Sequence, residues 1–226
     1  MANDTPRARV PSATALSHKN PPLSPDPSEV RERVVLDDAQ IRRALMRIAH
    51  EIMESSSEVE SLYLVAIPNG GVPLGRRLVE NVESLSGVRP GMGIMDTTLY
   101  RDDLTIRGTR PRLRKTEMPS SVDDRLVILV EDVVNTGRTI RAAMDALMDF
   151  GRPRAVRVVA LVDRGRRELP IKIDHVGKNI PTQPGETVIL RIGEAESEDG
   201  ASQGTLEVVV GMQATANDVS MKRGQE

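Results

Sequence analysis

Two adjacent carboxylates, Glu131 and Asp132, follow the apolar run Val127–Val130. At the end of a buried strand such a pair is costly unless hydroxyl groups or a metal ion bind it. The next segment, Thr136–Thr139 (TGRT), begins a predicted helix, so main-chain N–H groups, the helix dipole and two hydroxyl groups meet at an anion site. The alternative is an ordinary acidic strand end before a threonine-capped helix, but it does not explain why the two carboxylates and the helix cap occur together. The segment predicts carboxylates for a sugar's hydroxyl groups beside amides for a phosphate.

The elements that position this segment alternate between strand and helix. Apolar runs of strand length are followed by amphipathic helical patterns. Strands are predicted at Ser61–Ile67, Arg125–Glu131 and Ala155–Val162, and helices at Val72–Leu85 and around Ile140–Leu147. This order predicts an α/β fold with a doubly wound, mainly parallel sheet. Ligands of such sheets bind beyond the carboxyl ends of the strands, where the acidic pair and the glycine-rich turn Pro68–Gly71 both fall.

Further elements are predicted towards both ends of the chain. A helix begins at Asp37 or Asp38, where Gln40 can close a capping box. Its apolar residues recur at helical spacing: Ile41, Leu45, Ile48 and Ile52. Strands are predicted at Gly93–Tyr100, Thr187–Ile192 and Leu206–Val210, and a mobile arm at Arg101–Lys115. We therefore divide the chain into a disordered leader (1–30), one domain (31–210) and a disordered tail (211–226).

The composition excludes several kinds of site. The chain of 226 residues has a net charge of −2 and no cysteine, which excludes disulfides, zinc-thiolate sites and a cysteine nucleophile. No apolar run approaches the ~20 residues that cross a bilayer, so we expect a cytoplasmic protein without a membrane partner. With two tyrosines, one phenylalanine and no tryptophan, the chain lacks aromatic platforms for stacking bases. Arginine would have to carry much of any RNA binding.

The segment Val127–Thr139 (VILVEDVVNTGRT) resembles the phosphoribosyl pyrophosphate (PRPP) motif of type I phosphoribosyltransferases: four apolar residues, two acids, then T-G-x-T. The resemblance implies that Glu131 and Asp132 bind the ribose 2′ and 3′ hydroxyl groups. It also implies a cradle for the 5′-phosphate, formed by Val134, Asn135, Thr136, Gly137, Arg138 and Thr139. A Walker loop lacks the preceding acids.

Other strings resemble a narrower family, the bacterial pyrimidine-operon attenuation regulators that are also uracil phosphoribosyltransferases. They are TLYRDDL (98–104), GRPR (151–154), LVDRGRRELP (161–170), VGKNIPT (176–182) and IRRALMRIAHE (41–51). The resemblance covers about residues 34 to 192. It implies a phosphoribosyltransferase fold with a small hood and a mobile arm. The reaction that it implies is uracil plus PRPP to uridine monophosphate (UMP) plus pyrophosphate with Mg²⁺, and a homodimer or higher homo-oligomer is the expected assembly.

The resemblance also assigns the pyrophosphate end of the site. Asn69, Gly70 and Gly71 fall in the pyrophosphate loop, where glycines let amides face a diphosphate. Arg101 would neutralise the leaving pyrophosphate as a cationic clamp; the alternative is a solvated arm. Gly70 stands where the family has an arginine, which implies weaker pyrophosphate binding.

Two acids of the arm, Asp102 and Asp103, would bind Mg²⁺ or its water ligands, unless they are plain surface charges. Asp103 joins Asp132 and Arg101 as the predicted catalytic residues. Asn135, at a position often occupied by tyrosine or an acid in relatives, cannot be a general base. Proton removal from uracil would then fall to the leaving pyrophosphate, water or Asp132.

Base recognition is predicted beyond the next strand. The predicted pocket comprises Asp163, Val176, Lys178 and Ile180, with the main chain of 176–180 reading the base edge. Asp163 could instead simply pair with Arg164 or Arg167.

A regulatory function would need an RNA-binding face. Residues 151–180 hold eight Lys or Arg against three Asp or Glu, although neutral chains often segregate charge in this way for solubility. The resemblance implies that the face includes Arg47, His50, Arg167 and Lys172, and that UMP-dependent binding to an mRNA leader attenuates pyrimidine genes. Met46 replaces a usual hydroxyl residue there. Two alternatives are an enzyme that acts on another base, such as hypoxanthine or guanine, and a regulator that keeps the site only as a nucleotide sensor.

Overall fold

The computed structural model describes residues 32–56, 58–102, 115–193 and 204–212. The chain divides into two units, residues 1–30 and 31–226, and all described residues belong to the second. The predicted leader, most of the predicted arm and most of the predicted tail lie outside the described residues.

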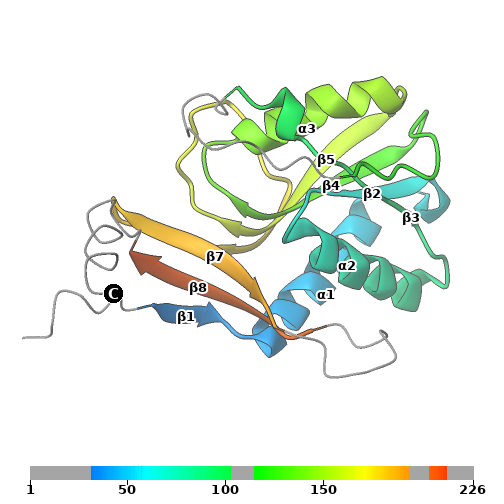
Figure 1. The fold of residues 1–226 in the computed structure, drawn as a ribbon. Coiled ribbons are helices and arrows are strands. Elements are labelled where there is room, and N and C mark those ends of the chain that lie inside the picture. The colour runs from blue at the N-terminus through cyan, green and yellow to red at the C-terminus, as the bar shows by residue number, and fades with distance from the viewer. Residues whose placement is uncertain (1–31, 57, 103–114, 194–203, 213–226) are drawn as a thin grey trace, which may run out of the picture. The chain divides into compact units, whose positions relative to one another are not determined.

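A five-stranded parallel sheet forms the centre of this unit (Figure 1). Its strands are β2 (Leu62–Ala66), β3 (Gly91–Ile94), β4 (Leu126–Val134), β5 (Ala155–Asp163) and β6 (His175–Asn179), in the spatial order β3-β2-β4-β5-β6. Strand β3 lies on one side of β2 within the sheet, and β4 lies on the other side of β2. The order therefore reverses between β2 and β4, where ligands of doubly wound sheets bind. The predicted α/β fold is confirmed.

Helices cover both faces of the central sheet (Figure 1). Helices α1 (Asp38–Ser55) and α2 (Gly71–Ser86) pack on one face, and α3 (Arg138–Leu147) packs on the other. The strands serve both layers because successive side chains alternate: Leu62 and Leu64 face α1 and α2, whereas Tyr63 and Val65 face α3. Three short 3₁₀ helices complete the helical segments: η1 (Val59–Ser61), η2 (Thr98–Tyr100) and η3 (Met148–Phe150).

The predicted capping box of α1 is present. The Asp37 side chain accepts a hydrogen bond from the Gln40 N–H at 2.7 Å, and the Gln40 side chain accepts one from the Asp37 N–H at 2.9 Å. The apolar residues that predicted this helix are buried: Ile41, Leu45, Ile48 and Ile52.

A second, antiparallel sheet provides the hood. It comprises β1 (Arg33–Leu36), β8 (Leu206–Met212) and β7 (Glu186–Ile192), in that order. Buried side chains of β7 and β8 pack in the same core as α1 and α2: Val188, Leu190, Leu206, Val208 and Val210. The sequence patterns predicted β7 and β8 but not β1, and β8 continues two residues past the domain end that we placed at position 210.

One predicted strand is shorter than expected. The pattern suggested a strand over Gly93–Tyr100, but β3 ends at Ile94 and η2 follows. The Asp96 carboxylate accepts a hydrogen bond from the Thr98 N–H at 2.9 Å, which turns the chain before a strand can continue.

Candidate active site

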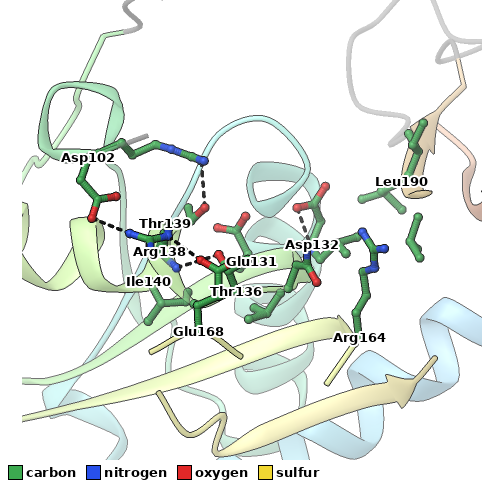
Figure 2. Close-up of a pocket in the computed structure, with 17 residues that line it drawn as sticks. Asp102, Glu131, Asp132, Thr136, Arg138, Thr139, Ile140, Arg164, Glu168 and Leu190 are labelled. Carbon is green, nitrogen blue, oxygen red and sulfur yellow. Dashed lines mark hydrogen bonds and ion pairs between the residues drawn. The ribbon is translucent and has the colours of Figure 1, made fainter. Parts of the chain in front are cut away.

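A cleft of about 730 Å³ opens at the carboxyl end of β4. Figure 2 shows the carboxylates of Glu131 and Asp132 between the first turn of α3 on one side and Arg164 and Leu190 on the other. The predicted site residues that line this cleft are Arg101, Asp102, Glu131, Asp132, Val134, Asn135, Thr136, Gly137, Arg138 and Thr139. Strand β4 thus carries its acidic pair to the start of the predicted phosphate cradle, residues 134–139, which we call the anion loop.

The two acids occupy an unfavourable environment for charge. Burial raises the pKa of Glu131 well above its usual range, the neighbouring Asp132 carboxylate raises it further, and Arg101 partly opposes this rise. Oε2 of Glu131 is buried and has no hydrogen-bond partner among the described residues. Burial also raises the pKa of Asp132, whose Oδ1 accepts the Val133 N–H at 2.8 Å. A buried acid with an open acceptor position is suited to receive hydroxyl groups from a ligand.

The predicted pyrophosphate loop lies beside Asp132. A Cβ atom at Gly70 would stand 2.1 Å from Oδ2 of Asp132, and one at Gly71 would stand 2.4 Å from the Val130 carbonyl oxygen. Glycine at both positions avoids these close contacts in this conformation. Asn69, Gly70 and Gly71 are not among the residues lining the cleft itself.

The anion loop bends sharply into α3. Gly137 adopts a left-handed conformation with φ of 90° and precedes the first helical residue. The first main-chain N–H groups of a helix have no acceptor within the helix, so they are available to an anion. The Arg101 guanidinium donates to Oγ1 of Thr139 at 2.9 Å. A cation from the arm and a hydroxyl group of α3 thus meet at this point.

Arg138 contributes differently from what its place in the motif suggested. Its guanidinium donates to Asp102 at 2.7 Å and to Glu168 at 2.8 Å, so the side chain joins the arm to the loop after β5 (Figure 2). Asp102 also pairs with Arg141 at 3.3 Å, and the two arginines occupy the carboxylate that we expected to bind metal. The described residues contain no cluster of metal-ligand side chains, and Asp103 lies outside them.

The far wall of the cleft comes from residues that the motifs did not mark. Val188, Ile189 and Leu190 of β7 provide an apolar surface, and Arg164 lies beside them. Arg164 is held by Oγ1 of Thr182 at 2.9 Å and by the Glu186 carbonyl oxygen at 2.8 Å. The hood therefore contributes to the cleft directly. Arg164 stands in the LVDRGRRELP string, which was a signal that could have identified it.

The four residues predicted for the base pocket do not line this cleft. Asp163 pairs with Arg167 at 2.7 Å, the alternative that we had left open. The Lys178 ammonium donates to the Val35 carbonyl oxygen of the hood at 3.1 Å. Val176 is half-buried in β6, and Ile180 is buried in the core.

The predicted RNA-binding residues differ in exposure. His50 and Lys172 are exposed. Arg47 is exposed too, but it contacts Glu51 and donates to the Val176 carbonyl oxygen at 2.7 Å. Arg167 is mostly buried and its guanidinium contacts three acceptors within the protein.

None of the helices in the described ranges has both the length and the apolar character that crossing a membrane requires.

Comparison with known proteins agrees with this geometry. The phosphoribosyl transferase domain model matches residues 34–189. A bifunctional protein PyrR of Pelotomaculum thermopropionicum is 50% identical over 165 residues, covering 73% of this chain and 91% of the relative. That of Chloroflexus aurantiacus is 46% identical over 187 residues, covering 83% and 98%. A solved Trypanosoma cruzi hypoxanthine phosphoribosyl transferase superimposes with a TM-score of 0.61 at 22% identity, covering 89% of this chain and 100% of that one, which shows a shared fold. This chain belongs to the phosphoribosyl transferase domain family and, within it, to the PyrR family.

Proposed function

We propose that this protein transfers the phosphoribosyl group of PRPP to uracil, giving UMP and pyrophosphate, and that its UMP-bound form binds an mRNA leader of pyrimidine genes. The observation that carries the enzymatic part is the cleft at the end of β4. There a buried acidic pair adjoins the anion loop and the first turn of α3.

Different residues of the cleft can bind different parts of PRPP. Glu131 and Asp132 accept the ribose hydroxyl groups, and the main chain of 134–139 with the Thr139 hydroxyl holds the 5′-phosphate. Arg101 lies next to Thr139 and supplies positive charge for the departing pyrophosphate. These interactions hold the reacting carbon in place, which is most of what the transfer requires.

Mg²⁺ enters this proposal as a partner of PRPP. Magnesium in such sites is bound by one or two carboxylates together with the substrate's phosphate oxygens. The acidic pair fits this requirement, because its carboxylates face the cleft and Glu131 keeps an acceptor position open. When bound, the ion would neutralise charge on the diphosphate.

The base would pack between the sugar site and the apolar side chains of β7. The proton of the base passes to the leaving pyrophosphate, to water or to Asp132, and burial raises the pKa of this carboxyl. The choice of uracil rests on membership of the PyrR family, since an apolar wall accepts any flat base. Uracil, hypoxanthine and guanine should therefore be offered separately with PRPP, and pyrophosphate release should be measured. Turnover is expected with uracil and with neither purine. Turnover with a purine but not with uracil would exclude the proposal.

The regulatory part rests on the outer face of α1 and the segment before β6. His50 and Lys172 are exposed there, and the exposed Arg47 donates to the Val176 carbonyl oxygen of β6. An electrophoretic shift of leader RNA with and without UMP tests this part. We expect UMP to tighten binding, and equal binding in both conditions would remove the regulatory half of the proposal while leaving the enzyme.

A further inference from the structure

The segment Arg167–Ile171, which we call the buttress, packs against the anion loop through its main chain and the Arg167 side chain. The Arg167 guanidinium donates from Nη1 to the Asn135 carbonyl oxygen at 2.8 Å, from Nε to the Ile171 carbonyl oxygen at 3.0 Å and from Nη2 to Asp163 at 2.7 Å. All three of its nitrogens are therefore engaged within the protein. The side chain is only 20% exposed.

The rest of the buttress holds the next peptide group. The N–H groups of Glu168 and Leu169 both donate to the Thr136 carbonyl oxygen, at 3.0 and 3.3 Å. A Cβ atom at Gly137 would stand 3.1 Å from the Ile171 side chain, so the loop and the buttress are in close contact. Two successive carbonyl groups of the anion loop are thus fixed from the same side.

These contacts fix the direction of the amides that an anion would meet. A trans peptide is planar, and its carbonyl oxygen and N–H point in opposite directions. Because the carbonyl groups of Asn135 and Thr136 point at the buttress, the N–H groups of Thr136 and Gly137 point away from it, and both residues line the cleft. N–H groups that are already fixed in this direction bind an anion without the free-energy cost of reorganising the loop.

We propose that Arg167 is a positioning residue for the 5′-phosphate of PRPP and UMP, acting through the Asn135 carbonyl group and not by touching the ligand. This inference rests on the proposed function of the cleft. It adds a role to the RNA contact predicted for Arg167, whose guanidinium has three acceptors within the protein.

Its neighbour Arg166 provides a matched control. Arg166 is exposed, one residue away, and carries the same charge. The two arginines therefore separate a loss of charge near the site from a loss of the contact to Asn135.

The test is the affinity for PRPP, titrated with Mg²⁺ in the absence of any base. Arg167→Ala should weaken PRPP binding by about tenfold or more and raise the KM for PRPP by a similar factor, while the KM for uracil stays within about twofold. Arg166→Ala should match the wild type in its affinity for PRPP, its KM for PRPP and its KM for uracil. Arg167→Lys keeps the positive charge but on a single nitrogen, so it should show a smaller loss of PRPP affinity. This variant replaces Arg167→Ala in the test if the alanine variant does not fold.

Unchanged PRPP affinity in Arg167→Ala, or an equal rise in the KM values of both substrates, would overturn the inference. Unchanged PRPP affinity together with weaker RNA binding would leave Arg167 with the RNA contact alone. Because the titration needs no turnover, wild-type protein that binds PRPP but does not use uracil would refute the proposed reaction alone, and the comparison of the arginine variants would still stand.

Discussion

At the scale of single residues, Glu131 is a buried acid whose Oε2 lacks a partner among the described residues. Its folded pKa lies well above the ordinary 4.5, because burial penalises the charged form. A group with a raised folded pKa stabilises the fold below its unfolded pKa, and that stability is lost as the pH rises through the folded value.

We therefore expect the melting temperature of the ligand-free protein to fall as the pH rises above 4.5, and the fall to be smaller in Glu131→Gln, which has no charge at this position. Thermal unfolding of both proteins over a pH series measures this. Identical pH dependence in the two would show that Glu131 is not the titrating group.

Thr139 gives a second test at this scale, because its hydroxyl group lies beside Arg101 at the first turn of α3. Thr139→Ala should raise the KM for PRPP more than the KM for uracil, since only PRPP carries the phosphates that this turn would bind. Thr139→Ser keeps the hydroxyl group and is the control. An equal effect of the alanine variant on both substrates would argue against a dedicated phosphate cradle.

At the scale of elements, an ion pair between α1 and α2 also binds the start of β8 in the hood. Arg77 of α2 donates to Oδ1 of Asp38 at 2.8 Å and to the Gly204 carbonyl oxygen at 3.0 Å, and the same Oδ1 accepts the Leu206 N–H at 3.0 Å. Burial opposes ionisation of Asp38, but its hydrogen bonds, from Arg42 first, outweigh burial and lower its pKa. Its contribution to stability is therefore present at neutral pH and lost as the pH falls through that lowered value.

Arg77→Met should lower the free energy of unfolding by about 2 kcal/mol, because it removes charged hydrogen bonds at a buried position. Arg76→Met, at the exposed neighbour, should change it by less than about 0.5 kcal/mol. Denaturant unfolding of both variants measures the difference. Equal stability of the two variants would mean that the pair does not fasten the hood.

The elements also show how far a sequence can be interpreted. Local patterns were enough for strands β2, β4 and β5 and for the capped helix α1, because period and capping are properties of neighbouring residues. They did not predict β6. Strand β1 was missed because four residues carry little pattern and its partner β8 lies far along the chain. The apolar wall from β7 and the internal partners of Arg138 and Arg167 were missed for the same reason, since each depends on contacts between distant segments.

At the scale of the whole molecule, the two proposed functions occupy different parts of the described structure. The cleft lies at the carboxyl end of β4, whereas the exposed Lys172 lies just before β6, at one edge of the central sheet. Exposed Lys115, next to the opposite edge strand β3, is a matched control. Lys172→Ala should weaken RNA binding and reduce its salt dependence by about one unit of log-log slope, with turnover unchanged. Lys115→Ala should change neither, and an equal loss in both variants would indicate only nonspecific attraction.

The central claim is that the acidic pair of β4 holds the ribose of PRPP, and Asp132→Asn tests it most directly because the side chain keeps its size, loses its charge and exchanges one acceptor oxygen for an N–H donor. Formation of UMP from PRPP and uracil, with Mg²⁺, should be measured for this variant and the wild type. The wild type should form UMP, and the variant should lose more than about 90% of kcat/KM, a cost above about 1.4 kcal/mol, with an unchanged melting temperature. A variant that folds and retains more than about a tenth of the wild-type kcat/KM would contradict the assignment of this cleft.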